Sequence, residues 1–290
     1  MTWLDRRELL GGLAAALSMQ PMRSPALAAS PSEHTFKLGE FEITVFSDGH
    51  LTIPTRFLAR NVSEAEIKAW LGQTADMVAP PSNVTLVRTP SEMILIDVGA
   101  GPHFMPTAGK LAENMEAAGI DRKAVTKVVF THAHPDHLWG TLDDFDNEPM
   151  FPNASYLISA AERNFWMGDD VVSRLPEDRQ NFAPGAKRNL DRIEDKLKTI
   201  RPSDDIVTGV RAIDTSGHTQ GHISLQVVSG TGAVVVLGDA LIVLSHFATA
   251  AGRGESAKLL IHCGGRHMWT GSDRTTAPSG SRRILASLQA

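Results

Sequence analysis

Four ionisable side chains within the run His132-Ala133-His134-Pro135-Asp136-His137 have the types and the spacing of metal ligands. Residues 125–130, just ahead of the run, are almost continuously apolar and predict a strand. Residues two apart in an extended segment point the same way, so His132 and His134 can converge on one cation. The aspartate and histidine that end the run can face a second cation. Neutral imidazole and carboxylate groups suit zinc, manganese, cobalt or iron.

Two further candidate ligands lie downstream in the sequence. His218 belongs to the stretch Ser216-Gly217-His218-Thr219-Gln220-Gly221-His222, and Asp239 ends a predicted strand in Leu237-Gly238-Asp239-Ala240. Structural zinc sites are usually closed by four protein ligands, whereas this set offers more ligands than one tetrahedral ion can use. A histidine-rich surface loop and a structural metal site are the plainer alternatives. We interpret the set as a two-metal hydrolytic centre, with His222 as a structural partner in its loop.

The elements that must position these ligands can be predicted from periodicity. The predicted strands are 36–38, 41–45, 83–87, 93–97, 125–130, 156–158, 223–228 and 234–237. The predicted helices are 107–118, 160–167 and 186–197. Strand-rich blocks that are followed by helices indicate a sandwich of sheets with helices outside.

The composition narrows the class of protein. A chain of 290 residues with 42% hydrophobic residues can bury a full core, and one domain is the simpler prediction. The net charge of −5 and the lack of a long basic run argue against a nucleic-acid partner. A single cysteine, Cys263, excludes an internal disulfide and a thiolate-rich zinc site.

The first residues have the pattern of an export signal. Arg6-Arg7 precedes an apolar stretch over 9–19, and Ala26-Leu27-Ala28 is a pattern that signal peptidase accepts. We predict a signal peptide of the twin-arginine type over 1–28, cleavage before Ala29, and a periplasmic or secreted protein. A plain secretory signal or an amino-terminal membrane anchor are the alternatives. No later stretch reaches the ~20 apolar residues that a spanning helix needs, so no stable membrane span is expected after signal removal.

The ordered pattern HxHxDH, GHTxGH and LGD resembles the metallo-β-lactamase superfamily, and the resemblance runs from about Glu40 to His246. Within that superfamily the chain is similar to the methyl parathion hydrolase and N-acyl-homoserine lactonase branch. The stretches that carry this similarity are 39–43, 47–49, 95–99, 164–166 and 238–242. The resemblance implies an α/β fold, the αββα sandwich of two mixed β-sheets with outer helices, as a hydrolase domain over 29–250.

The resemblance also implies a role for each candidate residue. Six side chains would hold two divalent ions, which are most simply zinc, with manganese, cobalt or iron as other candidates. One ion would be held by His132, His134 and His218. The other would be held by Asp136 and His137, and Asp239 would lie between the two ions. A hydroxide held by the two ions would be the nucleophile, because two cations lower the pKa of water from 15.7 towards ~7. Asp136 would also shuttle a proton to the leaving group, and Asp97 would steady the histidine loop.

Three aromatic residues occupy the places of pocket residues in the parathion-hydrolase relatives: Phe104, Trp166 and Phe182. An apolar pocket would suit an acyl chain or an aryl leaving group. Plain core packing is the alternative for all three.

The sequence departs from the family near its end. The second ion normally has one further histidine on a late strand after the last long helix, and no residue here fits. Residues 281–288 resemble the start of that helix, whereas His262 and His267 come too early, in a stretch rich in Gly and Arg. Natural divergence or an altered reading frame would explain the atypical tail over 251–290. We expect a weak second metal site and an uncovered sheet edge.

The leading hypothesis is hydrolysis of an ester-like bond in a small apolar substrate. A lactone such as an N-acyl-homoserine lactone comes first, which would make the protein quorum-quenching, and an organophosphate triester is a related target. β-Lactams rank lower, because the stretches above point to another branch. A thioester hydrolase or iron-dependent sulfur dioxygenase is one alternative, and a non-catalytic or impaired metal-binding relic is another. Relatives in this branch often dimerise, so a homodimer is also an expectation.

Overall fold

The computed structural model describes residues 32–58, 63, 65 and 76–240, together with the backbone of 258–260 and 269–270. The side chains of residues 56 and 58 are not described. The predicted signal peptide over 1–28, the histidines His246, His262 and His267, and most of the predicted tail lie outside the described residues. None of the described helices has the length and apolar character needed to cross a membrane.

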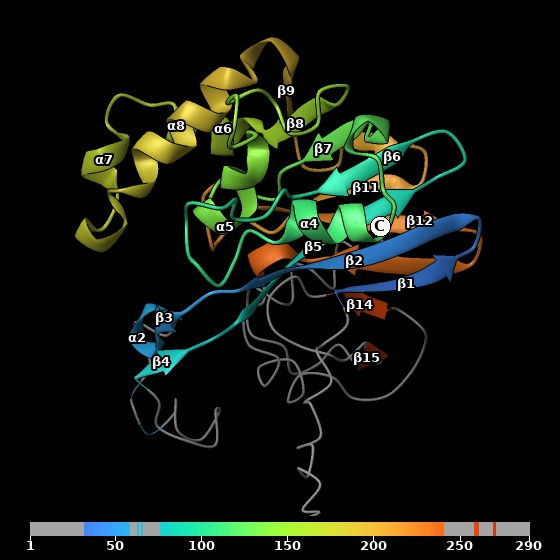
Figure 1. The fold of residues 1–290 in the computed structure, drawn as a ribbon, viewed down its shortest axis with the longest axis horizontal. Coiled ribbons are helices and arrows are strands. Elements are labelled where there is room, and N and C mark those ends of the chain that lie inside the picture. The colour runs from blue at the N-terminus through green and yellow to red at the C-terminus, as the bar shows by residue number, and fades with distance from the viewer. Residues whose placement is uncertain are drawn as a thin grey trace, which may run out of the picture. The chain divides into compact units, whose positions relative to one another are not determined.

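The larger of two main sheets has seven strands. Their bounds are β1 Glu33–Leu38, β2 Phe41–His50, β5 Pro81–Arg88, β6 Met93–Ile96, β7 Lys127–Val129, β8 Ser155–Ser159 and β9 Leu197–Ile200, in that spatial order (Figure 1). The pairs from β1 to β6 are antiparallel. The pairs from β6 to β9 are parallel, which makes the sheet mixed.

The second main sheet has six strands in sequence order. Their bounds are β10 Asp205–Val207, β11 Val210–Asp214, β12 Ile223–Ser229, β13 Gly232–Val236, β14 Lys258–Leu260 and β15 Trp269–Thr270. Only the pair of β13 with β14 is parallel. Strand β14 thus extends this sheet beyond β13. A small two-stranded sheet joins β3 Ile53–Pro54 to β4 Met77–Val78.

The helices are short and connect the strands of the larger sheet. Their bounds are α2 Thr55–Leu58, α4 Leu111–Ala117, α5 Pro135–Leu138, α6 Ala160–Trp166, α7 Val171–Arg174 and α8 Phe182–Arg192. Single turns of 3₁₀ helix lie at Arg122–Ala124, Trp139–Thr141, Glu177–Arg179, Glu194–Lys196 and Gly238–Ala240. Helices α5, α6, α7 and α8 gather on one side of the seven-stranded sheet (Figure 1).

Alternation along the strands explains how the layers pack. On β6, Ile94 and Ile96 face the six-stranded sheet, whereas Leu95 faces the helices. All three side chains are fully buried, so the larger sheet is covered on both faces, as its parallel part requires. The predicted sandwich of two mixed sheets with helices is confirmed. Several of the described helices pack against the larger sheet. None of the described helices covers the outer face of the smaller sheet.

A buried carboxylate fixes the loop that leads into α4. Asp48 accepts hydrogen bonds from the backbone N–H groups of Ala100 at 2.8 Å, Gly109 at 3.2 Å and Leu111 at 2.8 Å. Burial raises the pKa of Asp48 to about 6, against the lowering effect of these three bonds. The carboxyl therefore ties the end of β2 to two segments that are distant in the sequence.

Two predicted helices differ in their bounds from the observed ones. The helix predicted over 107–118 is α4, and it begins only at Leu111, because the carbonyl of Thr107 accepts from the N–H of His50 at 2.9 Å. The helix predicted over 186–197 is α8, which ends at Arg192. The chain then forms β9 beside β8, so tertiary pairing decided the state of residues 197–200. The smaller-sheet strands β10 and β11 were not predicted at all.

Candidate metal centre

The predicted histidine run lies at the carboxyl end of β7, as the apolar stretch before it indicated. His134 is the extended residue that precedes α5, with ψ of 157°. Pro135 is the first helical residue, where its fixed φ and missing N–H are tolerated. The helix start therefore turns Asp136 and His137 away from the direction of the extended histidines. One short stretch thus presents side chains to two adjacent places.

Three imidazoles and one carboxylate form the first group of side chains. His132 Nε2 lies 3.0 Å and His218 Nε2 lies 2.9 Å from His134 Nδ1. Asp239 Oδ2 lies 3.3 Å from His218 Nε2 and 3.9 Å from His132 Nε2. All four atoms lie within 4.8 Å of one another, as ligands of one ion must. We call this group the first half-site.

The geometry and electrostatics of the first half-site suit a divalent cation. A tetrahedral zinc ion with bonds of ~2.0–2.1 Å holds its ligand atoms ~3.3 Å apart. The distances above bracket that value. Burial, with the neighbouring imidazoles, lowers the pKa values of His132 and His134 well below the ordinary value. Both rings are therefore neutral at pH 7, and a cation between them would relieve the repulsion of facing lone pairs.

Asp136, His137 and Asp239 form the second half-site, whose ligand atoms also lie within 4.8 Å of one another. His137 Nε2 lies 3.3 Å from Asp136 Oδ2 and 3.2 Å from Asp239 Oδ1. This ring nitrogen is buried and makes no hydrogen bond with the part of the chain that is described. Burial alone would lower the pKa of His137, but the carboxylates of Asp136, Asp239 and Asp97 raise it well above its usual value. The place thus favours positive charge, which a metal ion supplies in place of a proton.

Asp239 belongs to both half-sites, because its Oδ2 faces the first group and its Oδ1 faces the second. Gly238, just before it, has a φ of +55°, and a Cβ there would lie 2.9 Å from both His222 Nε2 and Thr131 Oγ1. His222 Nε2 accepts the N–H of Asp239 at 3.0 Å. Burial lowers the pKa of His222 to about 3, so the ring stays neutral and can accept that bond. His222 therefore orients Asp239 and belongs to neither half-site.

Asp97 lies behind the two half-sites and determines which ring nitrogens face them. Its carboxylate accepts from the N–H of Thr131 at 2.7 Å, from the Thr131 hydroxyl at 2.8 Å and from His137 Nδ1 at 2.8 Å. The proton on Nδ1 leaves the lone pair of His137 on Nε2, which faces the second half-site. Thr131 Oγ1 in turn lies 3.1 Å from His132 Nδ1 and can accept its proton, which leaves Nε2 free for the first half-site. Asp97 adopts φ of +63°, a strained conformation typical of functional positions.

The predicted pocket aromatics occupy different environments. The rings of Phe104 and Phe182 meet edge to face with centroids 6.2 Å apart, and Phe182 meets the ring of His134 at 6.1 Å. Both phenylalanines are partly buried, so they can border a substrate beside the first half-site. Trp166 is fully buried, and its centroid lies 5.9 Å from that of His134. It supports the histidine from within the core, which differs from the predicted place in the pocket.

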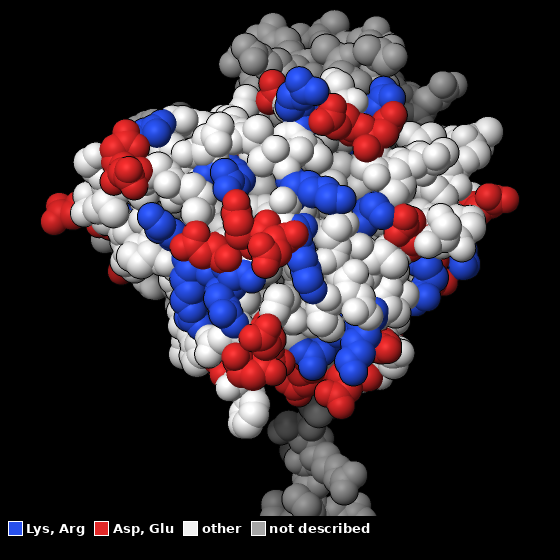
Figure 2. Space-filling model, turned by 90° about the horizontal axis from the view of Figure 1, so that it is seen from above, with Lys and Arg blue, Asp and Glu red and all other residues white. Residues whose placement is uncertain are grey.

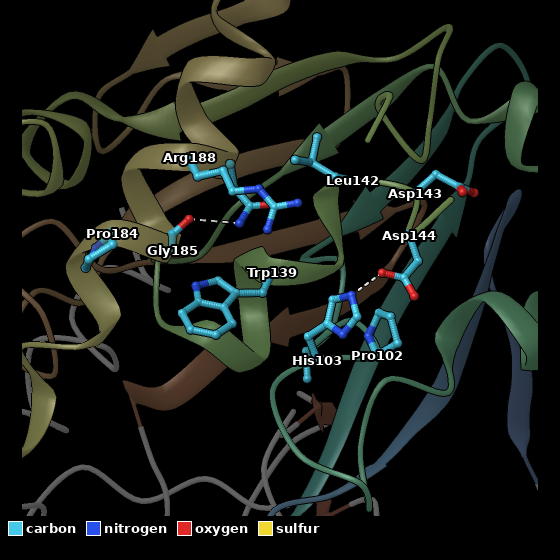
Figure 3. A pocket seen from close by; sticks show the side chains of 11 residues that line it. Pro102, His103, Trp139, Leu142, Asp143, Asp144, Pro184, Gly185 and Arg188 are labelled. Carbon is cyan, nitrogen blue, oxygen red and sulfur yellow. Dashed lines mark hydrogen bonds and ion pairs between the residues drawn. The ribbon is translucent and has the colours of Figure 1, made fainter. Parts of the chain in front are cut away.

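A cavity of about 290 Å³ lies beside this aromatic group. Figure 3 shows Pro102 and His103 on one side of it, Pro184 and Arg188 on the other, and the indole of Trp139 in the middle. None of the six candidate ligands lines the cavity. The indole of Trp139 meets Phe104 edge to face at 5.5 Å, so the aromatic group links the cavity to the half-sites. On the face of the molecule shown in Figure 2, basic and acidic side chains are interspersed.

Two polar residues that support the centre were missed by the sequence analysis. Thr131 directly precedes the histidine run. Its hydroxyl at the end of a predicted buried strand is the sequence feature that could have indicated a supporting role. Glu162 is fully buried and touches the loops of both His134 and His218. The sequence around Glu162 indicates a different role, because Ser159-x-x-Glu162 at the start of a helix predicts an ordinary capping box.

Comparisons with known proteins agree with this geometry. The family profile described as "Metallo-beta-lactamase superfamily" matches residues 78–280. A probable metallo-hydrolase of Mycobacterium tuberculosis is 29% identical over 194 residues, which cover 59% of this chain and 59% of that protein. The chain therefore spans about three fifths of the length of this curated relative.

Two solved structures are similar over most of their length. AidC, a dizinc quorum-quenching lactonase in complex with the product N-hexanoyl-L-homoserine, is 27% identical with a TM-score of 0.66, and the match covers 72% of this chain and 76% of AidC. The hydrolase AbOPH of the beta lactamase superfamily is 23% identical with a TM-score of 0.72, and the match covers 87% of this chain and 95% of AbOPH. The likeness to AbOPH shows the fold. The dizinc relative and the two half-sites together support the use of divalent metal ions.

Proposed function

This chain belongs to the metallo-beta-lactamase superfamily, and on that premise we propose that it is a metal-dependent hydrolase of ester-like bonds in small, largely apolar substrates. The observation that carries the proposal is the pair of half-sites that share Asp239. Two adjacent cation sites with a common carboxylate are a recurring device for hydrolysis. Closed structural sites, in contrast, use four ligands for one ion.

Each residue of the two half-sites has a separate role in the proposed reaction. Divalent ions, when bound, would lower the pKa of water towards ~7 and polarise the scissile carbonyl or phosphoryl oxygen. His132, His134 and His218 would hold the first ion with neutral rings. Asp136, beside His137 in the second half-site, would carry a proton to the leaving oxygen. Asp97 keeps the proton of His137 on Nδ1, away from the metal side of the ring.

The rings beside the first half-site support the proposed substrate class. Phe182 contacts both His134 and Phe104, which gives an apolar wall next to the proposed reacting carbonyl. Such a wall favours an acyl chain or an aryl group over a charged substituent. The similarity to AidC adds support for a lactone, first an N-acyl-homoserine lactone, which would make the protein a quorum-quenching enzyme. An organophosphate triester would present the same combination of an apolar group and a polarised oxygen.

Purified protein reconstituted with zinc or manganese should open N-hexanoyl-homoserine lactone, followed as acid release in a pH-stat. The double variant His132→Ala/His134→Ala should show only background hydrolysis, because it removes two of the four ligands of the first half-site. His34→Ala is the matched control, since that exposed histidine lies on the edge strand β1 and belongs to neither half-site. Undiminished hydrolysis by the double variant would refute the proposal.

We also propose that the protein acts outside the cytoplasm, on the strength of the paired arginines and the cleavage pattern before Ala29. Expression of the full chain should give a mature protein whose amino-terminal residue is Ala29. Replacing Arg6 and Arg7 by lysine should prevent that processing if the twin-arginine route is used. A mature chain that still begins at Met1 would contradict the proposal.

A further inference from the structure

Glu162 is a buried carboxylate with four hydrogen-bond donors around it. Its Oε1 accepts from the N–H of Ala133 at 3.0 Å and from the indole N–H of Trp166 at 2.8 Å. Its Oε2 accepts from the hydroxyl of Thr219 at 2.7 Å and from the N–H of Gly221 at 3.0 Å. Each oxygen thus receives two donors, which is the full complement expected of a carboxylate in the protein interior.

Three of these four donors belong to the loops that carry the first half-site. Ala133 lies between His132 and His134, whereas Thr219 and Gly221 follow His218 in the chain. One side chain on α6 therefore holds together two loops that are far apart in the sequence. The fourth donor, the indole of Trp166, lies on α6 itself and packs against the ring of His134. Every donor to Glu162 is thus close in the chain to a first half-site histidine or in ring contact with one.

The local packing leaves little freedom in this connection. Gly221 lies so close to the first turn of α6 that a Cβ added there would be 2.1 Å from the N–H nitrogen of Glu162. The side chain of Glu162 has no exposed surface. Its carboxylate is surrounded by N–H and O–H donors, three of which belong to the two loops. A carboxylate in this position is stable only while both loops keep their places.

The residue departs from the role that its sequence position suggests. In a capping box the glutamate at the third helical position turns back to the N–H of the capping serine. Here the Ser159 hydroxyl accepts from the N–H of Glu162, but the Glu162 carboxylate turns away towards the loops. The helix therefore lacks the second hydrogen bond of a capping box, and the carboxylate accepts hydrogen bonds from the two loops instead.

We propose that Glu162 is a positioning residue for the first half-site, which sets the separation of His132 and His134 from His218 by binding both loops with one carboxylate. The proposal rests on the proposed metal-dependent function. It adds a residue outside the six candidate ligands on which the affinity for the first ion depends. Its effect is on the ligand geometry, since the carboxylate itself is directed at backbone and hydroxyl donors.

The test compares Glu162→Gln with the wild type during titration of the metal-free protein with Co²⁺. Four ligand atoms converge on the first half-site and three on the second, so the first equivalent should fill the first half-site. Glutamine keeps the size of the side chain, but its NH₂ must face two donors and so releases one loop. We expect the first equivalent to bind about 10–100-fold more weakly and its visible absorption bands to change shape. Far-UV circular dichroism checks that the fold is kept.

Two further variants separate positioning from simple support of the helix. Ser159→Ala removes the hydroxyl that accepts from the N–H of Glu162 at the start of α6 but leaves all four donors to the carboxylate, and it should retain the wild-type affinity and cobalt spectrum. Thr219→Val removes one donor on the His218 loop and should weaken the first equivalent by about 3–10-fold, in the same direction as Glu162→Gln. This variant also serves as the test if Glu162→Gln does not fold.

The results discriminate between the two levels of the proposal. A folded Glu162→Gln or Thr219→Val chain with wild-type cobalt affinity and spectrum would overturn the positioning role alone. An equal loss in Ser159→Ala would overturn it as well, because the effect would then follow the start of the helix and not the loops. A wild-type chain that binds no cobalt would overturn the proposed function itself.

Discussion

Replacing Asp97 by asparagine tests how the second half-site obtains its free ring nitrogen. The carboxylate accepts three hydrogen bonds, from the Thr131 N–H, the Thr131 hydroxyl and His137 Nδ1, all between 2.7 and 2.8 Å. An asparagine has the same shape but only one oxygen. Its NH₂ group must face either the backbone N–H of Thr131, which cannot turn, or the N–H of His137.

The cheaper way to relieve that conflict changes the histidine tautomer. If the proton of His137 moves from Nδ1 to Nε2, the NH₂ group of the introduced asparagine gains an acceptor. The ring then presents an N–H to the second half-site and can no longer donate a lone pair there. Loss of such an orienting partner typically lowers metal affinity 10–100-fold, which corresponds to about 1.4–2.7 kcal/mol. The first half-site should change less, because its own ring His132 is held through Thr131.

The assay is metal retention during equilibrium dialysis against graded concentrations of a chelator, with zinc measured by mass spectrometry. Asp97→Asn should lose its second ion at a 10–100-fold lower chelator activity than the wild type, while the first ion is retained. Asp205→Asn is the control, because that exposed aspartate pairs with Arg211 on the surface of the smaller sheet. Equal retention of both ions in Asp97→Asn and the wild type would refute the reasoning.

Three further predictions concern single contacts. Asp48 has a folded pKa of about 6 against an ordinary value of 3.8, so its contribution to stability is full below pH 3.8 and is lost as the pH rises through 6. Relative to Asp48→Asn, the metal-free wild type should therefore lose up to about 3 kcal/mol of unfolding free energy between pH 4 and 7 in urea titrations. Parallel pH dependences of the unfolding free energy in the two proteins would contradict this prediction. Gly238→Ala should lower the free energy of unfolding by about 1–3 kcal/mol and also lower zinc retention, because the added Cβ would meet His222 Nε2. Gly230→Ala is the control, since Gly230 has φ of +60° with nothing within 4 Å and should show the backbone strain alone. Loss of zinc in both variants would contradict this explanation. Phe182→Ala should raise KM for a long-chain lactone about tenfold and leave a short-chain lactone nearly unchanged, and equal effects on both would place the acyl chain elsewhere.

The sequence allowed the prediction of the two mixed sheets and of the grouping of distant ligands. His132 and His218 are far apart in the chain, and the structure brings their Nε2 atoms to the same imidazole nitrogen of His134. The spacing predicted that His132 and His134 would converge, whereas the place of His218 beside them was implied by the resemblance to the superfamily. Whether the ligands hold metal ions stays a prediction.

The supporting contacts could not be predicted, because they depend on tertiary packing. Glu162 has the local signature of a helix cap, and only the approach of the His218 loop at Gly221 explains why its carboxylate turns elsewhere. The same holds for the end of the helix predicted over 186–197, because residue 197 begins a strand that pairs with β8. Trp166 was placed in the pocket by resemblance, whereas its full burial depends on how α6 packs against the sheet.

Titration of the metal-free chain with zinc, with the bound metal counted by mass spectrometry, tests most directly whether the two half-sites hold metal. We expect two ions per chain, and a large loss of both affinities in Asp239→Ala, because that carboxylate faces both groups. A single ion would refute the second half-site. A chain that retains no zinc at saturating concentration would contradict the metal-dependent function as a whole.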